Sequence, residues 1–199
     1  MTITASILAD SIAGGRRLIT FRLRYPRFIH AEFMTHRDFS RNASSSRAIP
    51  VERQIEDVLR DTAMPIHWGK NQKGMQAREE HDAPVDLCWP GFGANEEATP
   101  QEAWLLARDN AVEVARRFVA AGYHKQIVNR LLEPFSHINV VVTATRWDNF
   151  FALRLHPDAQ PEIHELAKQM KAAMDASTPV ELRAGQWHLP YLETEDRVG

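Results

Sequence analysis

The segment from Thr99 to Gly122 constrains the fold most tightly, because it predicts both ends of one long helix. Thr99 suits the N-cap, Pro100 the first helical position, and Glu102 the position that completes a capping box. Gly122 suits the left-handed position that ends a helix. Between these ends, apolar residues recur at steps of three and four and predict a stripe buried in the core: Trp104, Ala107, Ala111, Val114, Phe118 and Ala121.

Residue patterns typical of β-strands occur both before and after this helix in the sequence. Residues 17–25 alternate, with Ile19, Phe21, Leu23 and Tyr25 on one face, and Gly14-Gly15 separates them from β-branched residues 2–9. This arrangement predicts a hairpin. A buried strand is predicted over 137–145, and a closing strand and tail over 178–192. Strands near both ends with helices between them predict an α+β fold, a central and largely antiparallel twisted sheet flanked by helices.

Helical patterns fill most of the remaining chain, whereas residues 65–99 show no pattern and are rich in Gly and Pro. A structureless stretch of this length is usually functional or mobile. At 199 residues the chain fits one well-buried domain, so we expect a single domain over 1–199. Helices are expected over 27–34, from Pro50, over 123–132, around 147–154 and from Asp158.

The charge and cysteine content of the chain limit the kinds of ligand and the cellular setting that we expect. The net charge of −2 and the pI near 6.5 provide no basic field, so a nucleic acid partner is disfavoured and an anionic ligand should be small. The lone Cys88 excludes an internal disulfide and fits a reducing compartment. We see neither a secretory pattern nor an apolar run of about 18 residues, so we expect a soluble, cytoplasmic protein without a membrane partner.

A polar segment over residues 35–47 carries three Arg, four Ser and one His. Arg forks bind phosphate or carboxylate, and Ser and Asn supply short-range hydrogen bonds. We therefore expect an anion-binding loop that contributes nothing to the core; a plain solvated loop is the alternative. The chain has no Gly-x-Gly-x-x-Gly or Walker pattern, so Arg and Ser side chains would have to hold any nucleotide.

Two further arginines, Arg130 and Arg154, lie in apolar surroundings. An Arg is costly to bury unpaired, so each should face either an anionic ligand or a carboxylate such as Glu133 or Asp158. The nine histidines are scattered without a His-x-x-x-His pair, so no catalytic metal is expected. Neither the Ser44–Ser46 run nor Cys88 has the setting of a nucleophile.

Three ordered blocks resemble the flavin-dependent thymidylate synthases. The first is Pro26–Arg37 continuing to Ser45 and Arg47, which is similar to a signature with an Arg-His-Arg triplet, a Ser seven residues later and a further Arg two places on. The second, Arg130–Pro134, resembles the family's Arg-x-x-Leu-Pro. The third runs from Asn149 to Arg154 and resembles Asn-Phe-x-x-Leu-Arg, followed by Ala159–Ile163.

The resemblance implies a methyltransferase of dTMP biosynthesis. Methylenetetrahydrofolate would supply one carbon to C5 of dUMP, reduced FAD the hydride, and NADPH the electrons that reduce the flavin. No cysteine nucleophile is needed in this family. By position, Arg154 would be the catalytic residue that stabilises negative charge on the uracil ring. The resemblance also implies a homotetramer in which neighbouring subunits complete each site.

The resemblance further assigns ligands to both binding sites. The FAD contacts would be Thr35, His36, Arg37 and Asn149. The dUMP contacts would be Glu32, Ser45, Ser46, Arg47, Arg130 and Arg154.

Some positions depart from the signature. Thr35 stands where the family has the first Arg of the triplet, Glu32 where it has Gln, and Ala43 where it has Glu. Two alternatives therefore stay open. One is a flavin enzyme that acts on another pyrimidine nucleotide or makes another product, such as hydroxymethyl-dUMP. The other is a nucleotide-binding homologue without turnover.

Overall fold

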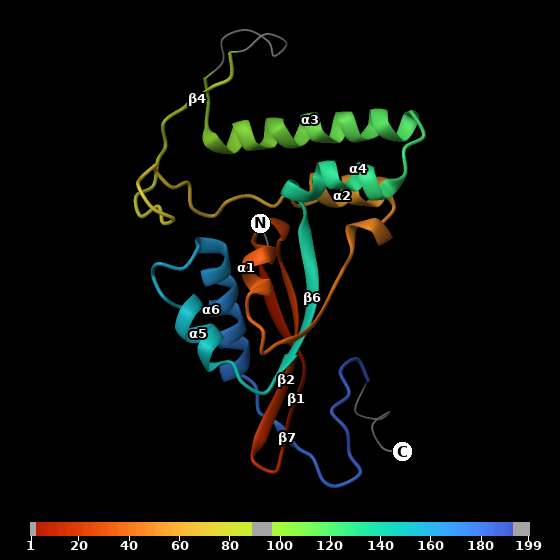
Figure 1. Ribbon diagram of the computed structural model, residues 1–199, viewed down its shortest axis with the longest axis vertical. Helices are drawn as coiled ribbons and strands as arrows, with labels where there is room; N and C mark the ends of the chain where they lie inside the picture. Colours follow the sequence, from red (N-terminus) through yellow and green to blue (C-terminus); the bar gives the residue numbers. More distant parts are fainter. Residues whose placement is uncertain (1–2, 89–96, 193–199) are drawn as a thin grey trace. The chain divides into compact units, whose positions relative to one another are not determined.

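The computed structural model describes residues 3–88 and 97–192 (Figure 1). Its chain divides into two compact units whose sequences interleave. The sheet unit consists of the described residues within 2–25, 29–44 and 138–199, and the helical unit of those within 26–28 and 45–137. The expectation of a single domain over 1–199 stays a prediction.

A mixed five-stranded sheet, in the order β3-β6-β2-β1-β7, forms the centre of the sheet unit. Strands β1 (Thr4–Ala13) and β2 (Arg16–Pro26) pair antiparallel, which confirms the predicted hairpin. Gly14 and Gly15 turn the chain with φ of 55° and 75°. Only residues that tolerate the left-handed region make such a turn without strain.

The remaining strands complete an α+β fold. Strand β3 (Ser40–Ala43) pairs antiparallel with β6 (His137–Ala144), which confirms the strand expected over 137–145. The closing strand expected within 178–192 is the two-residue β7 (Val180–Glu181), which runs parallel to β1. The sheet is thus largely antiparallel, as predicted, with one parallel edge strand.

The core of the sheet unit follows from the alternation in β2. All four apolar residues of its inner face, from Ile19 to Tyr25, are at most 1% exposed. Helix α6 (Pro161–Asp175) packs on β1 and on α5 (Asp148–Arg154), as Figure 1 shows. Three of its apolar residues at helical spacing are fully buried, and the side chain of Gln160 caps its N-terminus by accepting from Ile163 N. The buried set on α6 is Ile163, Leu166 and Met170.

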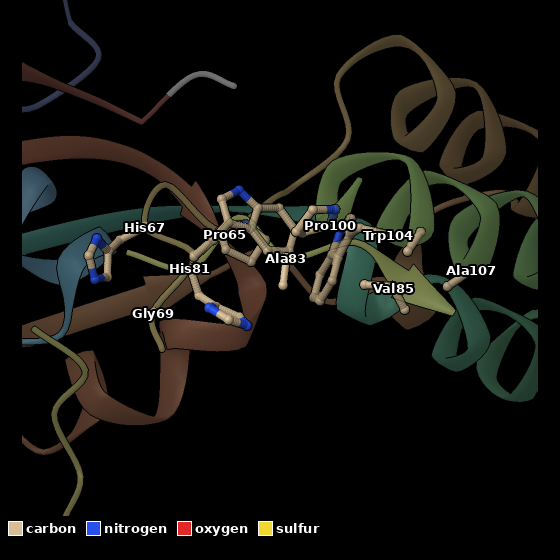
Figure 2. Close-up of a pocket in the computed structure, with 11 residues that line it drawn as sticks. Pro65, His67, Gly69, His81, Ala83, Val85, Pro100, Trp104 and Ala107 are labelled. Atoms are coloured by element: carbon tan, nitrogen blue, oxygen red, sulfur yellow. The ribbon is translucent and has the colours of Figure 1, made fainter. Parts of the chain in front are cut away.

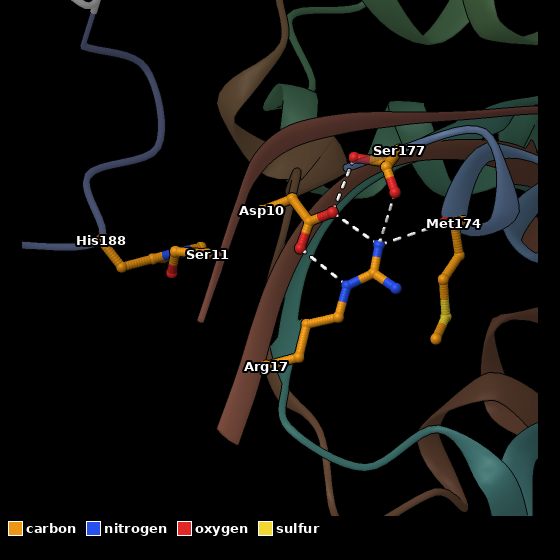
Figure 3. A network of polar contacts seen from close by, with 6 residues as sticks. All are labelled: Asp10, Ser11, Arg17, Met174, Ser177 and His188. Atoms are coloured by element: carbon orange, nitrogen blue, oxygen red, sulfur yellow. Dashed lines mark hydrogen bonds and ion pairs between the residues drawn. The ribbon is translucent and has the colours of Figure 1, made fainter. Parts of the chain in front are cut away.

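An ion pair within the hairpin, between Arg17 and Asp10, is hydrogen-bonded to the end of α6 (Figure 3). Arg17 donates to both carboxylate oxygens of Asp10, at 2.9 and 2.6 Å, and Ser177 Oγ donates to the same carboxylate at 2.6 Å. Arg17 Nη2 also donates to the carbonyls of Met174 and Ser177. Burial alone would raise the pKa of Asp10, but the hydrogen bonds from Arg17 and Ser177 outweigh it and lower that pKa.

Three α-helices form the described part of the helical unit: α2 (Val51–Arg60), α3 (Pro100–Ala120) and α4 (Lys125–Leu132). Pro50 is the N-cap of α2 rather than its first helical residue. Two 3₁₀ turns flank the helices, η2 (Ser46–Ala48) and η3 (Glu133–Phe135). The buried cluster between the helices consists of Val51, Ile55, Val58, Val112, Ala115, Val128, Leu132 and Phe135.

Helix α3 confirms its predicted ends but not its predicted stripe. The capping box of Thr99 and Glu102 is formed, and Gly122 has a φ of 82°. The most buried residues of α3 are Val112 and Ala115, whereas Val114 is 41% exposed. The predicted stripe is therefore wrong at Ala107, Val114 and Ala121, which are all exposed, because the partner helices α2 and α4 decide which side of α3 is covered.

The irregular stretch over 65–99 contains only short pairings among its described residues. Strands β4 (Val85–Asp86) and β5 (Glu97–Ala98) form a two-residue ladder, and Gly69 bridges Glu80. The helix expected over 27–34 is η1 (Arg27–Ile29) followed by α1 (His30–Met34). Within the two described ranges, no helix has the length and apolar character needed to cross a membrane.

Candidate functional site

Arg154, the last residue of α5, is held by three acceptors in the sheet unit. Its Nε donates to His36 Nε2 at 2.9 Å. Its Nη2 lies 3.3 Å from Thr35 Oγ1 and 3.5 Å from the carbonyl oxygen of Glu32. These contacts fix the plane of the guanidinium through two of its three nitrogens.

His36 accepts this hydrogen bond as a neutral imidazole. Burial, followed by the charges of Arg154 and Arg41, lowers the pKa of His36 to about 4. The residue is 6% exposed, and its ring packs on Phe39 and edge-on to Phe150. Because Nε2 accepts from Arg154, the ring proton resides on Nδ1.

All three acceptors of Arg154 are uncharged, which distinguishes it from Arg17 and Arg130. Arg17 pairs with Asp10 and Arg130 with Glu133. Arg154 forms no ion pair with any residue in the described ranges, and the predicted partner Asp158 lies 3.8 Å from His156 Nδ1 instead. Arg154 is thus a fixed cation without an ion-pair partner in the described part of the chain.

The four residues predicted to contact FAD line one cavity of about 240 Å³ in the sheet unit. Arg37 and Asn149 bring donors for an anion, and Arg146 adds a second guanidinium, which pairs with Asp38 at 3.3 Å. Aromatic rings complete the lining. The full lining is Thr35, His36, Arg37, Asp38, Phe39, Arg146, Asn149 and Phe150.

This donor set fits part of an FAD molecule. Guanidinium and amide groups suit a diphosphate, and aromatic side chains suit a flat ring. The volume is enough for one portion of the cofactor and not for the whole. The residues that would hold it here are those of the 35–39 segment together with Asn149.

Glu32 lies beside Arg154 and carries an unsatisfied buried atom. Its Oε2 is buried and has no hydrogen-bond partner among the described residues, while its carbonyl accepts from Thr35 and Arg154. A buried acceptor without a partner costs about 1–3 kcal/mol. The contact of Arg154 with the Glu32 carbonyl places two predicted dUMP ligands, Glu32 and Arg154, next to each other.

The other predicted dUMP ligands belong to the helical unit. Ser46 is 4% exposed, and its Oγ donates to Glu133 Oε1 at 2.6 Å. Arg130 Nη1 lies 3.5 Å from Glu133 Oε2. Arg130 therefore has the carboxylate partner expected as its alternative to a ligand, and the same carboxylate occupies the hydroxyl of Ser46. Ser45 and Arg47 are exposed on either side of Ser46.

Asn129 holds the 3₁₀ turn η2, which carries Ser46, against α4. It is fully buried on α4, and its Nδ2 donates to the carbonyls of Ser46 and Ile49 at 2.7 and 2.9 Å. The role of Asn129 did not emerge from the sequence, and for Glu133 the sequence predicted only a pairing with Arg130 and not the bond from Ser46. The available signals were a polar residue within an apolar helix and a Glu where the family motif has Leu.

The polar segment over 35–47 contributes to the core, contrary to expectation. His36, Phe39 and Ser46 are all buried. Phe39 packs against Trp147 and Phe150, with ring centroids 4.6 and 5.4 Å apart. A single aromatic residue in a polar stretch was enough to anchor it, because the sheet unit offers an aromatic cluster to receive it.

A larger cavity of about 570 Å³ lies in the helical unit (Figure 2). Trp104 and Ala107 of α3 line it together with His67, His81 and other residues of the irregular stretch. His67 contacts Ala77 O and Glu80, and no group of three or more His, Cys, Asp or Glu that could hold a metal occurs in the described part of the chain.

Comparison with solved structures supports the fold. The chain is similar to the UMP/dUMP methylase PolB from Streptomyces cacaoi bound with 5-Br dUMP, with a TM-score of 0.58, 18% identity, and coverage of 87% of this chain and 90% of PolB. The same protein bound with 5-Br UMP gives a TM-score of 0.57 at 19% identity, with coverage of 87% and 88%. No curated protein matches the sequence.

The sequence also matches a family model, that of the thymidylate synthase complementing proteins, over residues 17–180. This range contains Glu32, the 35–47 segment, Arg130, Asn149 and Arg154. Because the match spans most of the chain, the protein belongs to the thymidylate synthase complementing protein family.

Proposed function

We propose that the protein is an FAD-dependent thymidylate synthase that converts dUMP to dTMP, with methylenetetrahydrofolate as one-carbon donor and NADPH as reductant. Membership of the thymidylate synthase complementing proteins supports this reaction class. The crystal structures of PolB with brominated pyrimidine nucleotides support a nucleotide as substrate for the shared fold.

The observation that carries the proposal is the uncompensated guanidinium of Arg154. For C5 of uracil to form a bond to the electrophilic one-carbon unit, electron density must build up on the ring and its carbonyl oxygens. A cation that is already oriented stabilises such charge without reorganising, which is the most effective form of electrostatic catalysis. Neutral acceptors on Glu32, Thr35 and His36 orient Arg154 and leave its charge intact.

The remaining predicted ligands are assigned to the cofactor and to the two parts of the nucleotide. FAD would be held by Thr35, His36, Arg37 and Asn149, and when bound it supplies the hydride of the reaction. Glu32 and Arg154 would hold the pyrimidine. The phosphate would be held by Ser45, Ser46, Arg47 and Arg130. A homotetramer with shared sites and a cytoplasmic location belong to the same proposal.

The direct test is the absorption spectrum of the purified protein, before and after addition of FAD. We expect a bound-flavin spectrum that is bleached by NADPH. A colourless protein that also fails to bind added FAD would contradict the proposal.

A different pyrimidine substrate or product is the second candidate. It is favoured by Thr35, which lines the 240 Å³ cavity and stands where the family signature has Arg. Mass analysis of the product from dUMP, methylenetetrahydrofolate and NADPH separates the two candidates. A gain of one methyl group excludes the second candidate, and tight dUMP binding without turnover indicates a homologue that binds nucleotide only.

A further inference from the structure

We propose that Thr35 is a positioning residue for Arg154: with His36 it forms an uncharged cradle that fixes the guanidinium and keeps its full positive charge. The consequence for turnover rests on the proposed function. The cradle itself is a property of the folded protein and is measurable without substrate.

The hydroxyl of Thr35 is committed as an acceptor toward Arg154. A hydroxyl has one proton to donate. That of Thr35 goes to the carbonyl of Glu32, at 2.7 Å. The lone pairs of Oγ1 are then left for Arg154 Nη2, at 3.3 Å. The Glu32 carbonyl thus orients the hydroxyl, and the hydroxyl orients the guanidinium.

His36 is likewise a hydrogen-bond acceptor for Arg154. Its Nε2 accepts from Arg154 Nε at 2.9 Å. The charged groups that face it are Arg154 itself and Arg41, whose Nη1 donates to the His36 carbonyl at 2.6 Å. On the α6 side, His164 Nδ1 contacts the carbonyl of Arg154 at 2.9 Å. Two cations beside a buried ring disfavour the imidazolium, so the acceptor is preserved.

The cradle accepts hydrogen bonds from two nitrogens of Arg154, Nε and Nη2, and makes none with the third, Nη1. Nη1 makes no hydrogen bond to any residue within 3–88 or 97–192, and Arg154 is partly exposed. Nη1 is therefore available to a polarised oxygen of a ligand.

A hydroxyl at position 35 suits this task better than a charged group. A carboxylate at this distance would form an ion pair with Arg154, as Glu133 does with Arg130. A guanidinium, the group of the family signature, would offer no acceptor and would add a second cation. The exchange of Arg for Thr is consistent with a change from donor to acceptor at this position.

The test compares Thr35→Val, which keeps the shape and removes the hydroxyl, with Thr35→Ser, which restores it. Thr178→Val is the matched control, because Thr178 is also an exposed Thr of the sheet unit. We expect Thr35→Val to lower kcat for dUMP by about tenfold with little change in KM, as for loss of one hydrogen bond to a charged group. Thr35→Ser should recover most of the kcat that Thr35→Val loses, and Thr178→Val should keep kcat near that of the unaltered protein.

A second readout needs no turnover. The Nε–H resonance of Arg154, assigned by its loss in Arg154→Lys, should exchange slowly with water in the unaltered protein and in Thr35→Ser. In Thr35→Val we expect exchange to be about tenfold faster, because the guanidinium loses one of its anchors. Unchanged exchange in Thr35→Val, or failure of Thr35→Ser to restore it, would overturn the cradle. Slow exchange without turnover of dUMP by the unaltered protein would instead refute the proposed function alone.

Discussion

Glu133→Gln should tighten the binding of dUMP. In the structure the Glu133 carboxylate lies against Ser46 and Arg130, two residues that the proposal assigns to the nucleotide phosphate. Gln keeps the size of the side chain and an oxygen that accepts from Ser46 Oγ. Only the negative charge beside the phosphate site is removed.

The magnitude follows from distance and charge. Arg130 Nη1 lies 3.5 Å from Glu133 Oε2, so a phosphate bound on Arg130 would lie roughly 6 Å from the carboxylate. At that distance in water each pair of unit charges costs about 0.7 kcal/mol, and a phosphate with almost two charges about twice that. Salt screening roughly halves the total. We therefore expect an affinity gain of about threefold to tenfold.

Calorimetric titration with dUMP, at low and at moderate salt and with FAD present throughout, measures this gain. The matched control is Glu56→Gln, which removes the same charge from another i,i+3 pair of the helical unit, Arg53 with Glu56 at 3.9 Å. We expect no gain in the control, and a smaller gain in Glu133→Gln at the higher salt. Unchanged or weaker dUMP binding in Glu133→Gln would refute the assignment of Ser46 and Arg130 to the phosphate.

Three further predictions concern stability. The pKa of His36 is about 4 in the folded protein, so the unfolded chain binds a proton at this residue first as the pH falls from 6.5. Denaturant titrations should therefore show the free energy of unfolding decreasing by no more than about 3 kcal/mol between pH 6.5 and 4. His36→Gln should remove this pH dependence. Arg17→Met should cost about 2 kcal/mol by denaturant titration, because the buried Asp10 carboxylate loses its cation; a loss below 0.5 kcal/mol would refute that account. Thr99→Ala should cost about 1 kcal/mol through the lost N-cap of α3, and equal stability would contradict it.

Local signals predicted much of the fold. The Gly14-Gly15 turn and the alternation after it depend on neighbouring residues alone, and so do the capping residues around Thr99. Such features are legible in one sequence because their energetics are local. The buried side of α3 could not be predicted in this way, because packing against α4 determines that Ala115 is buried and Val114 exposed.

The candidate site was predicted by residue type and not by arrangement. The motifs named His36 and Arg154, but their hydrogen bond joins residues 118 positions apart. The bond between Ser46 and Glu133 spans 87 positions. Pairings of this range depend on the tertiary fold, so the sequence could only leave open whether Arg130 faces a ligand or a carboxylate.

The decisive measurement is the rate of dUMP methylation by Arg154→Ala, compared with the unaltered protein under saturating FAD, methylenetetrahydrofolate and NADPH. Circular dichroism and FAD binding of the variant control for its fold. If the fixed cation stabilises charge on the pyrimidine, the rate falls by at least about 100-fold while fold and flavin binding persist. A correctly folded Arg154→Ala that retains a near-normal rate would contradict the account.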